Sequence, residues 1–225
     1  MFKFIFLDLD DTLLDFHKAE ALAIARTFRE VGLEPTDELI ARYSRVNKLH
    51  WEMLERGELT RAQVRVQRFG YLFREWGLDA DPRRCQELYE AYLCIGHYYI
   101  DGAMELLDYL KPKYRLYLAS NGTARVQDAR LKSSGIGAYL DDQFISERMG
   151  ADKPTLEFFK RSFDRIPDFD PERAMIIGDS LTSDIRGGNN AGIKTCWFNP
   201  RGITPSVQVQ IDYEIHRLNQ LKTIL

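Results

Sequence analysis

Three short apolar runs constrain the fold of this chain most, because each of them stops abruptly at polar residues. Residues 3–9 end among acids, residues 115–119 end at Ser-Asn-Gly, and residues 174–177 end at Gly-Asp-Ser. A continuous apolar run of this length is typical of a strand that is buried on both faces of a sheet. Residues 194–199 and 142–145 predict a fourth and a fifth strand.

Helical patterns follow two of these runs, at residues 126–134 and at residues 184–191. Strands that alternate with helices predict right-handed crossovers and a parallel sheet covered by helices, which is a Rossmann-like α/β fold. Ligands bind such sheets beyond the carboxyl ends of the strands. We therefore expect the polar clusters that end the three runs to converge on one site.

A long segment without strand character, residues 18–98, separates the first run from the second. Its apolar residues recur at helical intervals, and glycine or proline breaks fall at 32–35, 57–60 and 77–82. This pattern predicts an insertion of about four helices.

The length of 225 residues fits one domain that carries a sizeable insertion. We predict an α/β core domain of residues 1–15 and 99–225 and a helical cap domain of residues 16–98. Because the insertion leaves the sheet directly after the first strand, we expect it to cover the active end of the sheet.

Composition excludes several classes of function. Lys and Arg number 31 against 34 Asp and Glu, which leaves a net charge of -3 and predicts no nucleic-acid polymer as a partner. The three cysteines form no CxxC pair, so neither a disulfide framework nor a zinc site is expected, and a cytoplasmic location fits best. No apolar run is long enough for a membrane span. Oligomeric state stays open.

The acidic segment after the first strand carries the chemistry. Asp8 and Asp10 are two residues apart, so both side chains can point toward one pocket as the chain turns. A carboxylate can attack phosphorus and form an aspartyl-phosphate, which divides one difficult displacement into two steps. We predict Asp8 as the nucleophile and Asp10 as the general acid and base.

Further acids follow the third strand. Mg²⁺ prefers oxygen ligands in octahedral geometry, and Asp8, the Asp10 carbonyl and Asp179 supply them. Asp184 lies five residues after Asp179 and is predicted to complete the Mg²⁺ site, through a bound water or by aligning its neighbour. For the phosphate oxygens we predict three groups of donors, namely Ser120, the backbone N–H of Asn121, and Lys153.

Adjacent acids after a strand can also be no more than a solvated turn. Here the four segments around Asp8, Ser120, Lys153 and Asp179 occur in a consistent order, and together they resemble the four motifs of the haloacid dehalogenase superfamily. The helical insertion is similar to the first type of cap in that superfamily. The resemblance implies an Mg²⁺-dependent phosphatase, with the roles already given and with Thr12 supporting the first loop among the phosphate-binding residues.

The same resemblance disfavours dehalogenation as the reaction. Members that displace halide resemble this pattern but lack the second acid at the position of Asp10, which this chain has. The expected substrate is therefore a small phosphorylated metabolite.

A finer resemblance is to the house-cleaning pyrimidine 5′-nucleotidases of this superfamily, and it implies a nucleoside 5′-monophosphate as the substrate. The residues that carry it are Val46-Asn47-Lys48, Trp51, Gly57, Thr60, Ile145-Ser146-Glu147, Gly150, Lys153-Pro154, Ser183-Asp184-Ile185, Gly187-Gly188, Ala191-Gly192 and Thr195-Cys196-Trp197. Asn47 and Trp51, one helical turn apart, are predicted to hydrogen-bond and stack on a base. The alternative for both is helix packing inside the cap.

Two other functions stay open. A sugar-phosphate phosphatase or a phosphomutase of the β-phosphoglucomutase type would use the same catalytic set. A non-catalytic binding protein is the alternative outside enzymes, and the complete set from Asp8 to Asp184 argues against it.

Overall fold

The computed structural model describes residues 1–225, which form two compact units. The sheet unit consists of residues 1–15 and 98–225, and the helical unit consists of residues 16–97. The predicted cap domain ends at residue 98, one residue later than the helical unit of the structure. No helix is both long enough and apolar enough to cross a bilayer.

The sheet unit is built on one six-stranded parallel sheet with the order β3-β2-β1-β4-β5-β6. Its strands are β1 (Phe4–Leu7), β2 (Arg115–Ser120), β3 (Asp142–Ile145), β4 (Ala174–Gly178), β5 (Lys194–Phe198) and β6 (Tyr213–Ile215). The predicted parallel α/β sheet is confirmed, and five of its strands were expected. β6 was missed because a three-residue strand with a glutamate at its centre carries no apolar run.

The strand order reverses beside β1, because β2 and β3 lie on one side of it and β4 to β6 lie on the other. The register pairs Leu7 with Leu118 on one side and with Ile177 on the other, so the three strands end at nearly the same level. This edge is the switch point at which open α/β sheets bind ligands. The polar residues that follow β1, β2 and β4 therefore meet there.

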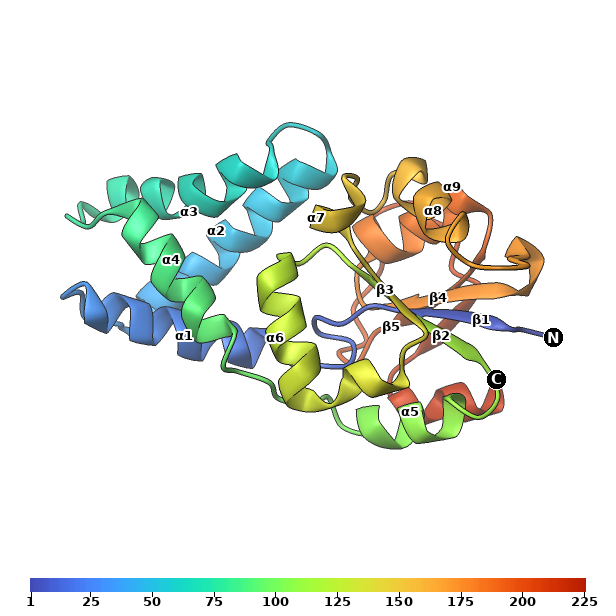
Figure 1. Cartoon of the computed structure of the whole chain (residues 1–225). Helices are drawn as coiled ribbons and strands as arrows, with labels where there is room; N and C mark the ends of the chain where they lie inside the picture. Colours follow the sequence, from blue (N-terminus) through green and yellow to red (C-terminus); the bar gives the residue numbers. More distant parts are fainter. The chain divides into compact units, whose positions relative to one another are not determined.

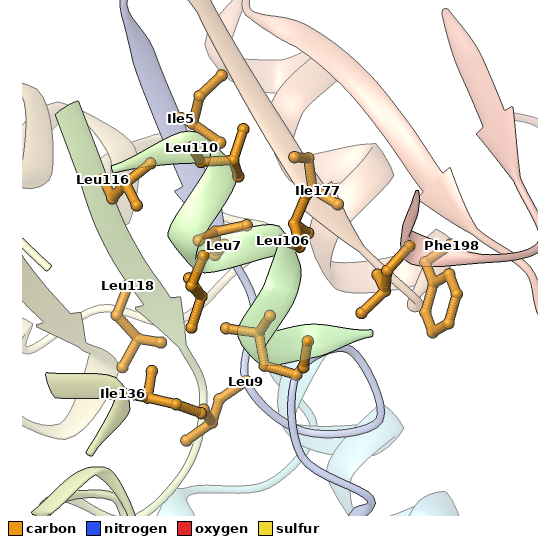
Figure 2. Close-up of a cluster of buried hydrophobic side chains, with 14 of the residues drawn as sticks. Ile5, Leu7, Leu9, Leu106, Leu110, Leu116, Leu118, Ile136, Ile177 and Phe198 are labelled. Atoms are coloured by element: carbon orange, nitrogen blue, oxygen red, sulfur yellow. The ribbon is translucent and has the colours of Figure 1, made fainter. Parts of the chain in front are cut away.

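Each face of the sheet has its own core, since successive side chains of a strand point to opposite faces. Ile5 and Leu7 face a cluster with Leu106 and Leu110 of α5 (Ala103–Leu110), which Figure 2 shows. The same cluster takes in side chains from α6 (Ala124–Ser134) and from the 3₁₀ helix η4 (Leu218–Thr223).

Aromatic rings fill the opposite core. Phe4 and Phe6 face α8 (Leu156–Phe163), and the rings of Phe6 and Tyr117 stack with their centroids 5.3 Å apart. Figure 1 shows α8 and α9 (Arg186–Ala191) on one side of the sheet and α5 on the other. Because both faces are covered, the central strands β1 and β4 are apolar throughout, as predicted.

Two adjacent glycines let α9 pack closely in this second core. A Cβ atom at Gly187 would lie 2.6 Å from the ring of Phe159, and one at Gly188 would lie 2.7 Å from Ile176 and 2.6 Å from Thr195. Any side chain at these two positions would push α9 off the sheet and off α8. The Gly-Gly pair is therefore a packing requirement.

The helical unit has the four helices that the breaks predicted, α1 (Phe16–Glu30), α2 (Asp37–Glu55), α3 (Arg61–Trp76) and α4 (Pro82–Leu93). Side chains satisfy the free N–H groups at three helix starts, where Thr36, Thr60 and Asp81 are the N-caps. Gly77 ends α3 in the left-handed conformation, with φ 61°. The sequence thus determines the helix ends by local rules.

We expect Gly188→Ala to lower the free energy of unfolding by about 1–3 kcal/mol, because the added methyl group overfills the contact between α9 and the sheet. Chemical denaturation followed by circular dichroism measures the change. Gly137→Ala is the matched control, since a Cβ there meets its neighbours at 3.6 Å or more, and it should change stability by less than about 1 kcal/mol. Equal losses in the two variants would contradict the close-packing argument.

Candidate active site

The loop after β1 turns back on itself within seven residues. The N–H of Asp8 donates to the Ile177 carbonyl at 3.0 Å and continues the ladder between β1 and β4. Asp11 takes the left-handed conformation with φ 59°, and its N–H donates to the Leu14 carbonyl at 2.7 Å. A non-glycine residue in this region of φ marks a strongly constrained turn. The turn keeps the Asp8 side chain buried at the end of the strand.

Lys153 is the centre of the polar cluster. Its buried ammonium group donates to Asp8 Oδ1 at 2.7 Å, to Asp184 Oδ1 at 2.6 Å and to the Ala119 carbonyl at 2.5 Å. These three bonds use all three of its protons. Burial by itself would lower the pKa of Lys153, but the carboxylates of Asp184 and Asp8 outweigh that effect and raise it. The side chain is therefore a fixed positive charge.

The Asn121 side chain holds the backbone of Lys153 in place. Its amide group donates to the Lys153 carbonyl and its oxygen accepts from the Lys153 N–H, both at 2.8 Å. The sequence predicted only the Asn121 backbone N–H as a phosphate donor. The paired amide contact is an additional link that joins the end of β2 to the segment that carries Lys153.

The loop after β4 places the other acids. Ser180 caps a π-helical turn, η3 (Leu181–Ile185), and the N–H of Ser180 donates to Asp184 Oδ2 at 3.1 Å. A Cβ atom on Gly178 would overlap the Asp184 carboxylate, so only glycine leaves room for that carboxylate. The Trp197 indole N–H donates to the Asp179 carbonyl at 2.8 Å and fixes the backbone there. π-Helical turns like η3 are common at functional sites.

Asp8, Asp179 and Asp184 form a compact carboxylate cluster. One oxygen from each lies within 4.8 Å of the others. Burial is the largest cause that raises the pKa of Asp8 to about 8, with the charges of Asp184 and Asp10 adding to it and Lys153 opposing it. Burial and the charges of Asp8 and Asp184 likewise raise the pKa of Asp179 well above its ordinary value.

These shifts indicate what the cluster would bind. When all three carboxylates are ionised, the single ammonium of Lys153 leaves two negative charges, which a divalent cation would balance. All three donors are hard oxygens, which suits Mg²⁺ better than a softer metal. The residues present therefore fit the predicted Mg²⁺ site.

The structure brings the remaining predicted residues of the sheet unit to the same edge. Thr12 is buried, and its hydroxyl donates a long bond of 3.5 Å to Asp8 Oδ2. Ser120 is buried at the end of β2. The Asp10 side chain lies outside the carboxylate cluster, and both of its oxygens accept hydrogen bonds from α6.

Those bonds come from Gln127 and Arg130, which the sequence analysis did not single out. Arg130 is fully buried and donates to Asp10 Oδ1, while Gln127 donates to Asp10 Oδ2 at 2.7 Å. The signal was present, since the two residues are three apart on the helix that directly follows Ser120. Residues at that spacing share one face of a helix.

The two candidate residues of the helical unit differ in their surroundings. Asn47 is buried, its amide group donates to Glu20 at 2.6 Å, and its oxygen accepts from Arg68. Arg68 in turn lies over the Tyr89 ring, 4.9 Å from its centroid. Asn47 thus bridges two buried charged groups, and a contact with a base would require it to change partners. Packing inside the helical unit, the alternative to a base contact, therefore describes Asn47 better than Trp51.

Trp51 is partly exposed on α2. The guanidinium group of Arg61 lies 5.3 Å from the centroid of its ring. An indole ring whose face contacts a planar guanidinium group can also stack on a planar base.

Comparisons with known proteins show the family to which this chain belongs. The family model described as haloacid dehalogenase-like hydrolase matches residues 2–192. The pyrimidine 5′-nucleotidase PynA of Streptococcus pneumoniae is 37% identical over 98% of this chain and 93% of its own length. The pyrimidine 5′-nucleotidase YjjG of Escherichia coli is 32% identical over 96% of both chains.

A solved structure is similar along the whole chain. The HAD-hydrolase YfnB of Bacillus subtilis is 40% identical, and its structure bound to magnesium superposes with a TM-score of 0.95 over 100% of this chain and 98% of that one. The family match covers far more than half of the sequence, and three relatives exceed 30% identity over nearly their whole lengths. This chain is a member of the haloacid dehalogenase-like hydrolase family.

Proposed function

We propose that this hydrolase is a Mg²⁺-dependent phosphatase that transfers the phosphoryl group of a phosphate monoester first to Asp8 and then to water. The observation that carries the proposal is the cluster of Asp8, Asp179 and Asp184, in which Lys153 bonds to the two buried members, Asp8 and Asp184. A phosphate monoester is an anion and reacts very slowly with an anionic nucleophile unless its charge is cancelled. This cluster combines a nucleophile with the means to cancel charge.

In the first step an Asp8 oxygen bonds to phosphorus while the bond from phosphorus to the leaving oxygen breaks. Asp10 gives its proton to that oxygen, so the product leaves as a neutral alcohol. In the second step a water molecule gives a proton to Asp10 and attacks the aspartyl-phosphate. The bond from phosphorus to Asp8 breaks, and inorganic phosphate is released.

Asp8, Asp179 and the Asp10 carbonyl would hold Mg²⁺, with Asp184 aligned beside them. Bound there, Mg²⁺ would neutralise charge on the transferred phosphoryl group. Lys153 supplies a permanent positive charge and Ser120 a hydroxyl donor for the phosphate oxygens. The Asn121 side chain holds the backbone of Lys153 in place through two hydrogen bonds.

The proposed substrates are nucleoside 5′-monophosphates, with pyrimidine nucleotides preferred. Support comes from PynA and YjjG, which are both named pyrimidine 5′-nucleotidases and which align with this chain over more than nine tenths of their lengths. In this proposal Trp51 stacks on the base and Asn47 contributes to the base contact from the same helix. The partner is then a small metabolite rather than a polymer.

We expect Asp8→Asn to lower phosphate release from p-nitrophenyl phosphate with Mg²⁺ by about a thousandfold or more, because the amide cannot form the covalent intermediate. Colorimetric detection of p-nitrophenol measures the rate. Asp11→Asn is the matched control, since it removes a charge from the same loop and asparagine tolerates the left-handed conformation of that position. Turnover that survives Asp8→Asn would overturn the assignment of the nucleophile.

We expect kcat/KM to be higher for pyrimidine nucleoside 5′-monophosphates than for ribose 5-phosphate by about tenfold or more, because only the nucleotides offer a base to bind. A malachite green assay of released phosphate over a panel with purine nucleotides and hexose phosphates measures this. A preference for hexose phosphates would contradict the proposal. Conversion of β-glucose 1-phosphate to the 6-phosphate would identify a phosphomutase instead.

We expect Trp51→Ala to raise KM for nucleotides by about tenfold through the loss of stacking, with KM for p-nitrophenyl phosphate changed far less. Trp76→Ala is the control, because Trp76 is another partly exposed tryptophan of the helical unit. Asn47→Ala is the weaker test, since it also removes one hydrogen bond each from the buried Glu20 and Arg68 side chains. An equal rise in KM for both substrates with Trp51→Ala would remove the base contact from the proposal.

A further inference from the structure

Gln127 and Arg130 form a buried pair beside Asp10 that has no role in the mechanism given so far. Both lie on α6, three residues apart, and Arg130 is 0% exposed while Gln127 is 1% exposed. Arg130 donates to Asp10 Oδ1, and the same nitrogen donates to the Gln127 side-chain oxygen at 3.2 Å. The side-chain amide nitrogen of Gln127 donates to Asp10 Oδ2 at 2.7 Å. Each oxygen of Asp10 is thus held by a different side chain.

The buried guanidinium group is costly unless it is paired. Taking a charge out of water is unfavourable, and a buried ion pair is often no more stable than an apolar replacement. Asp10 is the carboxylate paired with Arg130 in the sheet unit. A contribution to stability therefore explains Arg130 poorly. Its contact with Asp10 directly restrains the orientation of the Asp10 side chain.

Two donors to one carboxylate fix the rotamer of that carboxylate. A single bond would leave the Asp10 side chain free to rotate about its own axis, while bonds to both oxygens also fix the plane of the group. Each carboxylate oxygen has two lone pairs and uses one for Arg130 or Gln127. The second lone pair can carry or accept a proton while both contacts stay in place.

The same glutamine also touches the phosphate-binding hydroxyl. Gln127 donates a second bond to Ser120 Oγ at 2.8 Å, and the N–H of Gly122 donates to that oxygen at 3.1 Å. With two donors already on its oxygen, the Ser120 hydroxyl keeps its own proton for donation to a ligand. A Cβ atom at Gly122 would overlap the Gln127 amide, so the glycine makes this arrangement possible.

We propose that Gln127 and Arg130 are positioning residues that hold the Asp10 carboxylate in its orientation for proton transfer to and from the reacting oxygen. The inference rests on the proposed function, because it assumes that Asp10 is the general acid and base. It adds that the orientation of Asp10 is fixed by α6 and is tied through Gln127 to Ser120. A misplacement of about 1 Å at a reacting group can lower a rate by about a hundredfold.

The test compares two leaving groups. An alcohol must be protonated as it leaves, whereas p-nitrophenolate leaves easily without a proton, and kcat/KM reports the steps up to that departure. We expect Arg130→Met and Gln127→Met to lower kcat/KM for a nucleoside 5′-monophosphate by about 10- to 100-fold. For p-nitrophenyl phosphate we expect the loss with Arg130→Met to be less than about threefold. Lys132→Met, on an exposed residue of the same helix, should change neither value.

A second measurement separates positioning from a general loss of structure. In an Asp10→Asn background the carboxylate is gone, so Arg130→Met should cause no further loss greater than about twofold. Equal losses on both substrates, or the same loss with and without Asp10, would overturn the inference. If Arg130→Met does not fold by circular dichroism, Arg130→Lys and Gln127→Met are put through the same cycle.

Failure of the inference and failure of the proposed function give different results. A wild-type protein that releases no phosphate from either substrate overturns the proposed function and the inference with it. A wild-type protein that is active and loses activity with Asp8→Asn, but that shows additive effects of Asp10→Asn and Arg130→Met, overturns the inference alone.

Discussion

The two ion pairs of Lys153 with Asp8 and Asp184 are the contacts on which the polar end of the sheet depends. All three side chains are buried, and a buried carboxylate without a positive partner would be protonated or would disrupt the fold. The ammonium group pairs with two acids and also binds the Ala119 carbonyl, so it joins the ends of β1 and β2 to the loop after β4. The negative charge that remains is what makes the cluster fit a divalent cation.

This charge balance is assembled from segments that are far apart in the chain. Lys153 follows Asp8 by 145 residues, and the helical unit lies between them in sequence. The parallel sheet brings the segments together, because β1, β2 and β4 end at the same level on either side of the switch point. Small features then set the final distances: the amide of Asn121 holds the Lys153 backbone, and the absence of a side chain at Gly178 makes room for Asp184.

Much of this arrangement was predictable from local patterns. Apolar runs located five strands, glycine and proline breaks located the four helices of the helical unit, and the polar ends of the runs indicated an edge where Asp8, Lys153 and Asp184 do meet. β6 escaped prediction because it is short and mixed in polarity. Gln127 and Arg130 escaped because a polar pair on one helix face is usually solvated, and only the fold shows that this face is buried against Asp10.

The sequence by itself determined the kinds of elements, their order and the residue types at the strand ends, because periodicity and turn chemistry act over a few neighbouring residues. Only the tertiary structure decided which polar groups share a contact. In the folded chain, Asn47 hydrogen-bonds to both Glu20 and Arg68. Asn121 bonds to the backbone of Lys153, and Arg130 bonds to Asp10. The reason is physical: a side chain taken out of water must find its partners among the groups that the packed chain places beside it, however distant they are in sequence.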